Sequence, residues 1–558
     1  MRWLVTGILI LGLAAALRVS MIGERSLSHP EMYVPGLPLP AGLSDPPPRR
    51  DFWPMVRDVV ATDTHPPGYY AMMWPVIRLG GASEWSMRMP SVVCGVVTVG
   101  LLMWLGFVLG RPGAGMLAGA LLALNGYHVF WSQAARMYTL AGMLALLSTL
   151  LLVKAARDGR RGWTVPACYC GVMLMGLATH VFMWSLLAAQ MGWVAWRGWV
   201  RRGALPGLLR WQWLAATMGT PLLAVAAYQS GNPAATLSRD LLLCGGGLLQ
   251  FGFLWPREQG RLDTFPPGWT AAQASQSPYT LAWMALLALG LFLMWQARRV
   301  RGEEACAGPE HHTGPGWRVV AAAAAAATGM DLMLLRAAQT VALKSPLVMV
   351  LTRVMAAAPL AGLIGFLVAP RVWAWARNLR GPGGTLEDGL SGMGLVWASA
   401  LGPPALLWMF SMAARPVMTM RGLLAVYPAV ALLLALGVIE ASRDRRWVTA
   451  ALVLLLIPAH AWSVLEYSRR TIDPLRHKDF AEQLRRQIQA GDLVFYPIGW
   501  ANTPLLWYLP PERYKVVGWK FDEAGRNNPD ARVWVLSTYG AEPAEGMKAA
   551  VAGYRRIG

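Results

Sequence analysis

Long apolar runs recur along most of the chain, and their length constrains the fold more than any other feature. An α-helix crosses the hydrocarbon core of a bilayer with about 20 apolar residues. Runs of that length predict an all-α polytopic membrane protein with about thirteen transmembrane helices. The predicted spans are 3–19, 87–109, 113–131, 136–155, 164–180, 182–197, 210–229, 279–297, 318–337, 346–369, 391–411, 420–440 and 447–465.

Composition and charge support this interpretation. Of the 558 residues, 55% are hydrophobic and only 14% are charged, too few for the surface of a soluble protein of this length. The net charge of +20 would also suit nucleic acid or anionic lipid headgroups. Lys and Arg, however, cluster in short loops between apolar runs, which is typical of membrane topology. We find no nucleic-acid-binding signature and expect no nucleic-acid partner.

The loop charges also predict an orientation. If successive spans alternate in direction, the short loops near 338–345 and 412–419 lie outside. Their only basic residues are Lys344 and Arg415. Most other basic loop residues fall on the opposite side, so we expect a multi-pass protein of the cell inner membrane with a cytoplasmic N-terminus. The apolar run after Met1 has no clear cleavage site, and we interpret it as an uncleaved first helix.

Three segments are predicted to lie on the outer face. Two are long loops, 20–86 and 230–278, within a transmembrane domain of residues 1–465. The third is the tail, 466–558, where the charge rises and Leu484 and Ile488 repeat Phe480 at helical spacing. Segments 493–496, 516–517 and 533–536 are strand candidates, so a small α/β extracytoplasmic domain is expected.

Cysteine usage indicates no special chemistry. The cysteines are Cys94, Cys168, Cys170, Cys244 and Cys306, and most of them lie inside apolar runs. Their spacing matches no zinc site and implies no disulfide framework. We predict core positions for them and no metal centre.

Acidic, basic and aromatic residues gather on the predicted outer face. They are Glu31, Asp63, His65, Tyr69, Arg88, Arg136, Tyr138 and Arg421. This set suits transfer of a sugar from a polyprenyl phosphate, because a carboxylate accepts the proton of an attacking hydroxyl and arginines bind the departing phosphate. Such a reaction needs no nucleotide site, and the sequence has no signature of one.

Several motifs in order carry a family resemblance. They are the Glu31 region, Asp63-x-His65-Pro66-Pro67-x-Tyr69-Tyr70, Arg88-x-Pro90-Ser91, Ser132-Gln133-x-x-Arg136-Met137-Tyr138, Thr179-His180 and Arg421 to Tyr427-Pro428. In these residues the chain resembles the GT-C superfamily of membrane glycosyltransferases. The likeness is to the group of protein O-mannosyltransferases and lipid A aminoarabinose transferases.

The resemblance implies roles for particular residues. Glu31 would be the catalytic base or orient the acceptor, with Asp63 as the second candidate. Arg136 and His65 would contact the lipid phosphate. Tyr69, Arg88, Tyr138 and Arg421 would complete the substrate-binding set. The family usually has an Asp-Glu pair in the first loop, whereas Pro30 precedes Glu31 here, so Asp63 must act if the missing aspartate is the base.

The resemblance also implies the reaction. We expect inverting, metal-independent transfer of a hexose or pentose from a polyprenyl-phosphate sugar to a lipid, glycan or protein acceptor. No cofactor is expected, and a divalent metal is not indicated.

Each site residue has a structural alternative. Glu31 would also suit a solvated loop, and His65 a polar interface position. Asp63 would suit the N-cap of a helix that begins near Pro66. Arg136 would suit a snorkelling helix anchor. His180 and His460 are interpreted as hydrogen-bonded histidines of the bundle.

Two other functions stay open at this point. A lipid flippase or transporter would often have related halves with interrupted helices, and the sequence has no internal repeat. An inactive relative of the glycosyltransferases is the other alternative. Asp331, Arg336 and Arg353 lie inside predicted spans, where charges usually face a cavity or a partner.

Overall fold

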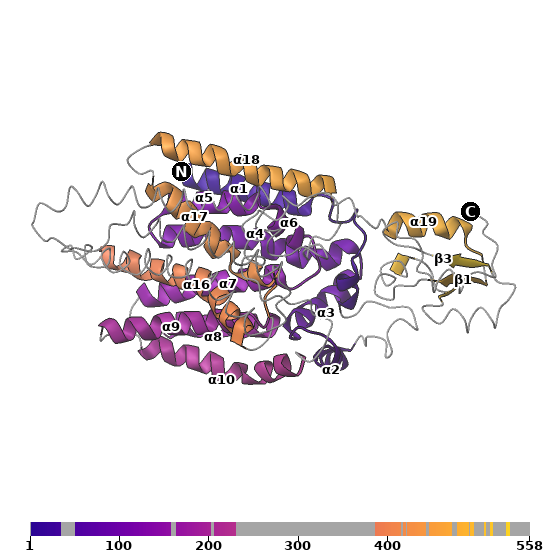
Figure 1. Ribbon diagram of the computed structural model, residues 1–558, viewed down its shortest axis with the longest axis horizontal. Coiled ribbons are helices and arrows are strands. Elements are labelled where there is room, and N and C mark those ends of the chain that lie inside the picture. The colour runs from indigo at the N-terminus through magenta and orange to yellow at the C-terminus, as the bar shows by residue number, and fades with distance from the viewer. Residues whose placement is uncertain are drawn as a thin grey trace, which may run out of the picture.

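The computed structural model is a bundle of long helices with a smaller group of elements beyond one end (Figure 1). It describes residues 2–34, 51–157, 163–201, 206–229, 385–413, 417–419, 421–441, 446–470, 477–489, 491–495, 507–508, 514–516 and 532–535. The bundle contains α1 (Arg2–Val19), α4 (Glu84–Val108), α5 (Pro112–Ala123), α6 (Gly126–Ser132), α7 (Tyr138–Arg157), α8 (Thr164–Thr179), α9 (Met183–Arg201), α10 (Pro206–Gln229), α16 (Thr385–Ala413), η3 (Gly422–Ala425), α17 (Tyr427–Ala441) and α18 (Arg446–Arg470).

Helices occupy every predicted span that falls within the described residues. Among those residues, four helices are long and apolar enough to cross a membrane, or up to five if a bent pair counts as one span. α8 and parts of α17 and α18 are apolar but shorter. The predicted spans 279–297, 318–337 and 346–369 lie outside the described residues, so the total of about thirteen stays a prediction.

The prediction of one continuous helix over 113–131 is wrong. α5 and α6 meet at an angle of 66°. Asn125 caps α6, because its side chain accepts a hydrogen bond from the His128 N–H at 2.7 Å and also donates to the Tyr427 hydroxyl at 2.8 Å. A side-chain cap of this kind lets a new helix begin inside an apolar run.

Arg18 stabilises the other side of the break. This fully buried α1 residue donates to the last carbonyls of α5, those of Leu122 at 3.0 Å and Ala123 at 3.2 Å. Its remaining donors go to Ala14, His128 and Ser132. A helix end without water needs such partners, so Arg18 satisfies the helix break and has no donor left for a ligand.

Close helix packing also joins α1, α4, α5 and α7. α4 packs against α5 and α7, and α1 packs against α4 and α5. A Cβ atom at Gly106 of α4 would overlap the backbone of Gly115 in α5. Small residues at such contacts allow the direct backbone approach common among membrane helices.

The first loop contains helices at one end of the bundle. These are the 3-10 helix η1 (His29–Tyr33), α2 (Phe52–Thr62) and α3 (Gly68–Gly80). They lie at the end that faces α19 (His477–Gln487) and the strands (Figure 1). This end therefore collects the first loop and the tail.

The tail holds strands at the predicted places. β1 (Asp492–Phe495) lies between β2 (Tyr514–Val516) and β3 (Val533–Val535), and both pairings are parallel. Leu484 and Ile488 are buried, as their spacing predicts. That residues 466–558 form a separate extracytoplasmic domain stays a prediction, as does the domain division at residue 465.

Candidate active site

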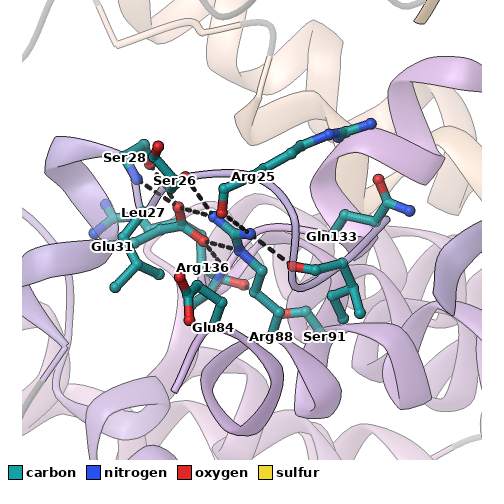
Figure 2. A network of polar contacts seen from close by, with 12 residues as sticks. Arg25, Ser26, Leu27, Ser28, Glu31, Glu84, Arg88, Ser91, Gln133 and Arg136 are labelled. Atoms are coloured by element: carbon teal, nitrogen blue, oxygen red, sulfur yellow. Dashed lines mark hydrogen bonds and ion pairs between the residues drawn. The ribbon is translucent and has the colours of Figure 1, made fainter. Parts of the chain in front are cut away.

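Glu31 and Arg88 form a buried ion pair near the N-terminal end of α4 (Figure 2). The guanidinium binds the carboxylate through two bonds, Nε to Oε1 at 2.8 Å and Nη2 to Oε2 at 2.9 Å. Each side chain is only 3% exposed. This bidentate geometry is the strongest arrangement open to the two groups.

Every acceptor position of Glu31 is occupied. Besides Arg88, its Oε1 accepts from the Ala135 N–H at 2.8 Å, and its Oε2 accepts from the N–H and hydroxyl of Ser28 at 2.7 and 2.9 Å. Burial raises the pKa of Glu31, but Arg88 and these donors hold it below its usual value. A carboxylate offers about four lone-pair sites, so this one has none left for a substrate hydroxyl.

Arg88 is equally saturated. Its Nη1 donates to the Ile22 and Arg25 carbonyls at 2.8 and 2.9 Å, and its Nη2 also donates to the Ser26 carbonyl at 2.8 Å. Together with Glu31 these contacts use all five N–H groups of the guanidinium. The contacts of Arg88 therefore hold the loop before η1 and leave no donor for the substrate-binding role expected from the sequence.

The ion pair is joined to the loop between α6 and α7. Ala135 of that loop donates to Glu31, and the next residue, Arg136, donates from Nη1 to the Pro30 carbonyl at 3.0 Å. Figure 2 shows Arg136 close to Glu31 and Arg88. The contacts around Glu31 thus fix the position of Arg136.

Asp63 is the second carboxylate of this region, and its surroundings differ. It ends α2 and lies before α3, so it does not cap a helix at Pro66; α3 begins at Gly68. Its Oδ1 accepts from the backbone N–H groups of Thr64 at 2.6 Å and His65 at 3.0 Å, and from His65 Nδ1 at 3.0 Å. These bonds form a tight turn around one carboxylate oxygen.

The other oxygen of Asp63 is less committed. Among the described residues, Oδ2 accepts only the Tyr70 hydroxyl, which lies very close to it. The Asp63 side chain is 16% exposed, against 3% for Glu31. Asp63 is therefore more exposed than Glu31, and its Oδ2 accepts fewer hydrogen bonds from the described residues.

Tyr70 links Asp63 to Arg136. Arg136 Nη1 reaches the Tyr70 hydroxyl at 3.4 Å, and that hydroxyl donates to Asp63. The tyrosine predicted from the sequence is the neighbouring Tyr69, which is fully buried in the same helix. Tyr69 and Tyr70 point about 100° apart around the helix axis. Their spacing from Asp63 in the sequence did not show which of the two faces the carboxylate.

Rings and a second arginine lie around His65. Its ring centroid is 6.3 Å from that of Tyr138 and 5.6 Å from that of His180. The Arg421 guanidinium lies 6.0 Å from the Tyr138 ring centroid. His180 lies directly after α8. We interpreted it as a histidine of the bundle, and its ring lies beside those of His65 and Tyr138.

Hydrogen bonds and charges set the protonation states of this cluster. Burial raises the pKa of Asp63, but the His65 hydrogen bond and the Arg136 charge lower it below its usual value. Burial and the charges of Arg136 and Arg421 lower the pKa of His65, despite the raising effect of Asp63. At neutral pH Asp63 is thus ionised and His65 is neutral, with its proton on Nδ1 facing the carboxylate.

The described residues contain no group of three or more His, Cys, Asp or Glu side chains arranged to hold a metal ion. They also include Cys94, Cys168 and Cys170, all unbonded. A metal or cofactor requirement is not tested by this arrangement.

Comparison with known proteins gives one family match. Residues 64–228 match the family described as dolichyl-phosphate-mannose-protein mannosyltransferase. This stretch contains His65, Tyr69, Arg88, Arg136 and Tyr138, whereas Glu31, Asp63 and Arg421 lie outside it. No curated protein matches the chain.

Two solved structures are similar over most of this chain. ArnT from Cupriavidus metallidurans, bound to undecaprenyl phosphate, is 12% identical with a TM-score of 0.45, over 98% of this chain and 94% of that chain. The archaeal oligosaccharyltransferase AglB from Archaeoglobus fulgidus, in complex with an inhibitory peptide and a dolichol-phosphate, is 12% identical with a TM-score of 0.42, over 92% of this chain and 65% of that chain. The family match over residues 64–228 agrees with the resemblance to membrane glycosyltransferases that the motifs predict.

Proposed function

We propose that the protein transfers a sugar from a polyprenyl-phosphate donor to an acceptor at the outer face of the inner membrane, with Asp63 as the catalytic base. The observation that carries this proposal is the meeting of an ionised, partly accessible Asp63 with Arg136, and of His65 with Tyr138, His180 and Arg421. The family match supports the glycosyltransferase class.

The proposed step conserves atoms and charge. The acceptor hydroxyl attacks the anomeric carbon, the bond from that carbon to the phosphate oxygen breaks, and polyprenyl phosphate leaves. The hydroxyl proton passes to Asp63 Oδ2. The acceptor hydroxyl becomes strongly acidic as the new bond to carbon forms, so a carboxylate of lowered pKa is basic enough to take its proton.

The arginines serve the leaving group. Arg136 uses Nη1 for the Pro30 carbonyl and the Tyr70 hydroxyl, and in this proposal its guanidinium also binds the donor phosphate. Arg421 adds a second positive charge beside Tyr138. Charge fixed before the reaction stabilises the phosphate that develops as the bond breaks.

Glu31 is a positioning residue in this proposal. Its carboxylate is saturated, and it acts on Arg136 through Ala135 and the Pro30 carbonyl. The acceptor is a lipid, glycan or protein, the transfer inverts the anomeric centre, and no metal is required. These three statements rest on the family resemblance.

The test is donor turnover by the full chain in proteoliposomes with a labelled polyprenyl-phosphate sugar. Asp63→Asn keeps the size and the Oδ1 acceptor but cannot take a proton, so we expect release of polyprenyl phosphate to fall by about 10²–10⁴-fold. Asp51→Asn is the matched control, because Asp51 is 81% exposed and pairs only with the half-exposed Arg78.

Two outcomes would overturn the proposal. Unchanged turnover in Asp63→Asn would exclude Asp63 as the base. Movement of the lipid across the bilayer by the wild type, with no release of sugar from any donor, would favour the transporter.

A further inference from the structure

Gln229 is a buried residue that contacts the Asp63 turn from a separate helix. It is the last residue of α10 and is 4% exposed. Its Nε2 donates to the Val59 carbonyl and the His65 carbonyl, both at 3.0 Å. Both hydrogens of the amide group are thus used on backbone close to Asp63.

The two carbonyls lie on either side of Asp63. The Val59 carbonyl also accepts the Asp63 backbone N–H at 3.0 Å, so it belongs to the last turn of α2. The His65 carbonyl lies at the end of the turn whose N–H groups bind Asp63 Oδ1. Gln229 therefore bridges the start and the end of the segment that carries the carboxylate.

The other half of this amide has no partner. Among the described residues, Gln229 Oε1 is buried and makes no hydrogen bond. An unpaired buried acceptor costs free energy, which the two Nε2 contacts must offset. A side chain of glutamine length with two donors explains the two contacts with backbone.

We propose that Gln229 is a positioning residue for the sugar transfer, and that it holds the 63–65 turn so that Asp63 Oδ2 faces the acceptor hydroxyl. This inference rests on the proposed function. It also assigns a role to α10, which is described up to residue 229 and, in the predicted topology, leads into the second outer loop, 230–278.

The other groups facing Asp63 act on its side chain. Tyr70 of α3 lies at Oδ2, Arg136 of the α6–α7 loop contacts the Tyr70 hydroxyl, and His65 lies at Oδ1. Further charge comes from Arg421, which lowers the pKa of His65. These contacts set the charge of Asp63, while Gln229 contacts the backbone that carries it.

The variant Gln229→Leu tests the inference by two independent measurements. The first is hydrogen exchange of the amides at 59–65 in the full chain, which needs no activity. We expect loss of protection there, because the carbonyls of Val59 and His65 lose a donor. Gln212→Leu is the matched control, since Gln212 is a fully buried glutamine of the same helix whose Nε2 donates to Tyr169.

The second measurement is the pH profile of donor turnover. A loosened turn misplaces Asp63 and weakens the N–H bonds to its carboxylate, so kcat should fall about 10–100-fold with little change in the donor KM. The same loss raises the pKa of Asp63 toward its usual value. A base works in its deprotonated form, so the acidic limb of kcat/KM should move to higher pH.

The outcomes separate the two proposals. Lost protection at 59–65 with no transfer by the wild type would show that Gln229 holds the 63–65 turn and would reject the transferase, and with it any role of Gln229 in sugar transfer. An active wild type with unchanged protection and an unshifted acidic limb in Gln229→Leu would overturn the inference. A loss of kcat equal to that of Gln212→Leu would also overturn it, because it would indicate a general effect on the bundle.

Discussion

Substitutions in the Glu31–Arg88 pair test most directly whether Glu31 positions Arg136 or acts as the catalytic base. Both side chains are 3% exposed, so removing one partner leaves an uncompensated buried charge. Such a loss costs about 3–5 kcal/mol. We therefore expect Glu31→Gln and Arg88→Met each to destabilise the protein by about this amount.

The double variant should cost less than the sum of the single ones. With both charges gone, no buried ion remains, although the carbonyls of Ile22, Arg25 and Ser26 still lack donors. We expect a coupling energy of about 2–3 kcal/mol. Unfolding in mixed micelles, followed by tryptophan fluorescence, measures it, with Asp51→Asn as a control that should stay close to the wild type.

The pH dependence of stability provides a second check. The pKa of Glu31 is lowered in the folded protein, so the unfolded state binds more protons in acid. The stability from this carboxylate is present above its unfolded pKa, about 4.3, and is lost as the pH falls through the lowered value. Glu31→Gln should lack this acid-dependent component.

One result would refute the positioning role. If Glu31→Gln abolished donor turnover while its stability and acid dependence matched the wild type, Glu31 would be the catalytic base that the family resemblance first implied. Additive single and double variants would likewise show that the pair is not coupled.

Two further predictions concern the phosphate site and the tail. Arg136→Lys keeps the charge but loses the planar fork, so the donor KM should rise about tenfold or more while kcat changes less; an unchanged KM would remove Arg136 from the phosphate site. Tyr508 accepts the Leu27 N–H at 2.8 Å and donates to Glu84 at 3.2 Å, so Tyr508→Phe should destabilise tail docking by about 1–3 kcal/mol. Faster limited proteolysis of the tail would measure this, and Arg486→Gln, in an exposed pair within α19, is its control.

Hydropathy and charge predicted much of the helical bundle, because apolar length is a local property of the sequence. The break within 113–131 was missed, since it depends on Arg18 and Asn125. Arg18 lies more than 100 residues from the carbonyls it satisfies. Nothing in the apolar run itself marks where a distant side chain supplies the missing hydrogen bonds.

The sequence predicted that the candidate residues come together, and their roles stay predictions. Asp63, His65 and Arg136 were selected from the predicted outer face and the family resemblance, and they do lie together. Glu31 was ranked above Asp63 because of that resemblance, and a sequence does not show how many hydrogen-bond donors surround a carboxylate. Arg88 could have indicated this ion pair from the sequence. A charge in the first turns of an apolar helix needs a partner, and here the partner is Glu31.

The location of the site follows from a constraint on all helical membrane proteins. Lipid-exposed backbone must stay helical, so irregular turns with free N–H groups occur at helix ends or where protein buries them. Asp63 follows α2, Arg136 lies between α6 and α7, and His180 ends α8. Each is held at an interruption of helical structure, where side chains can bind backbone and still face a ligand. A search for chemistry in such chains is therefore best directed at helix breaks, and among the carboxylates there, at the one whose acceptor positions are not already filled.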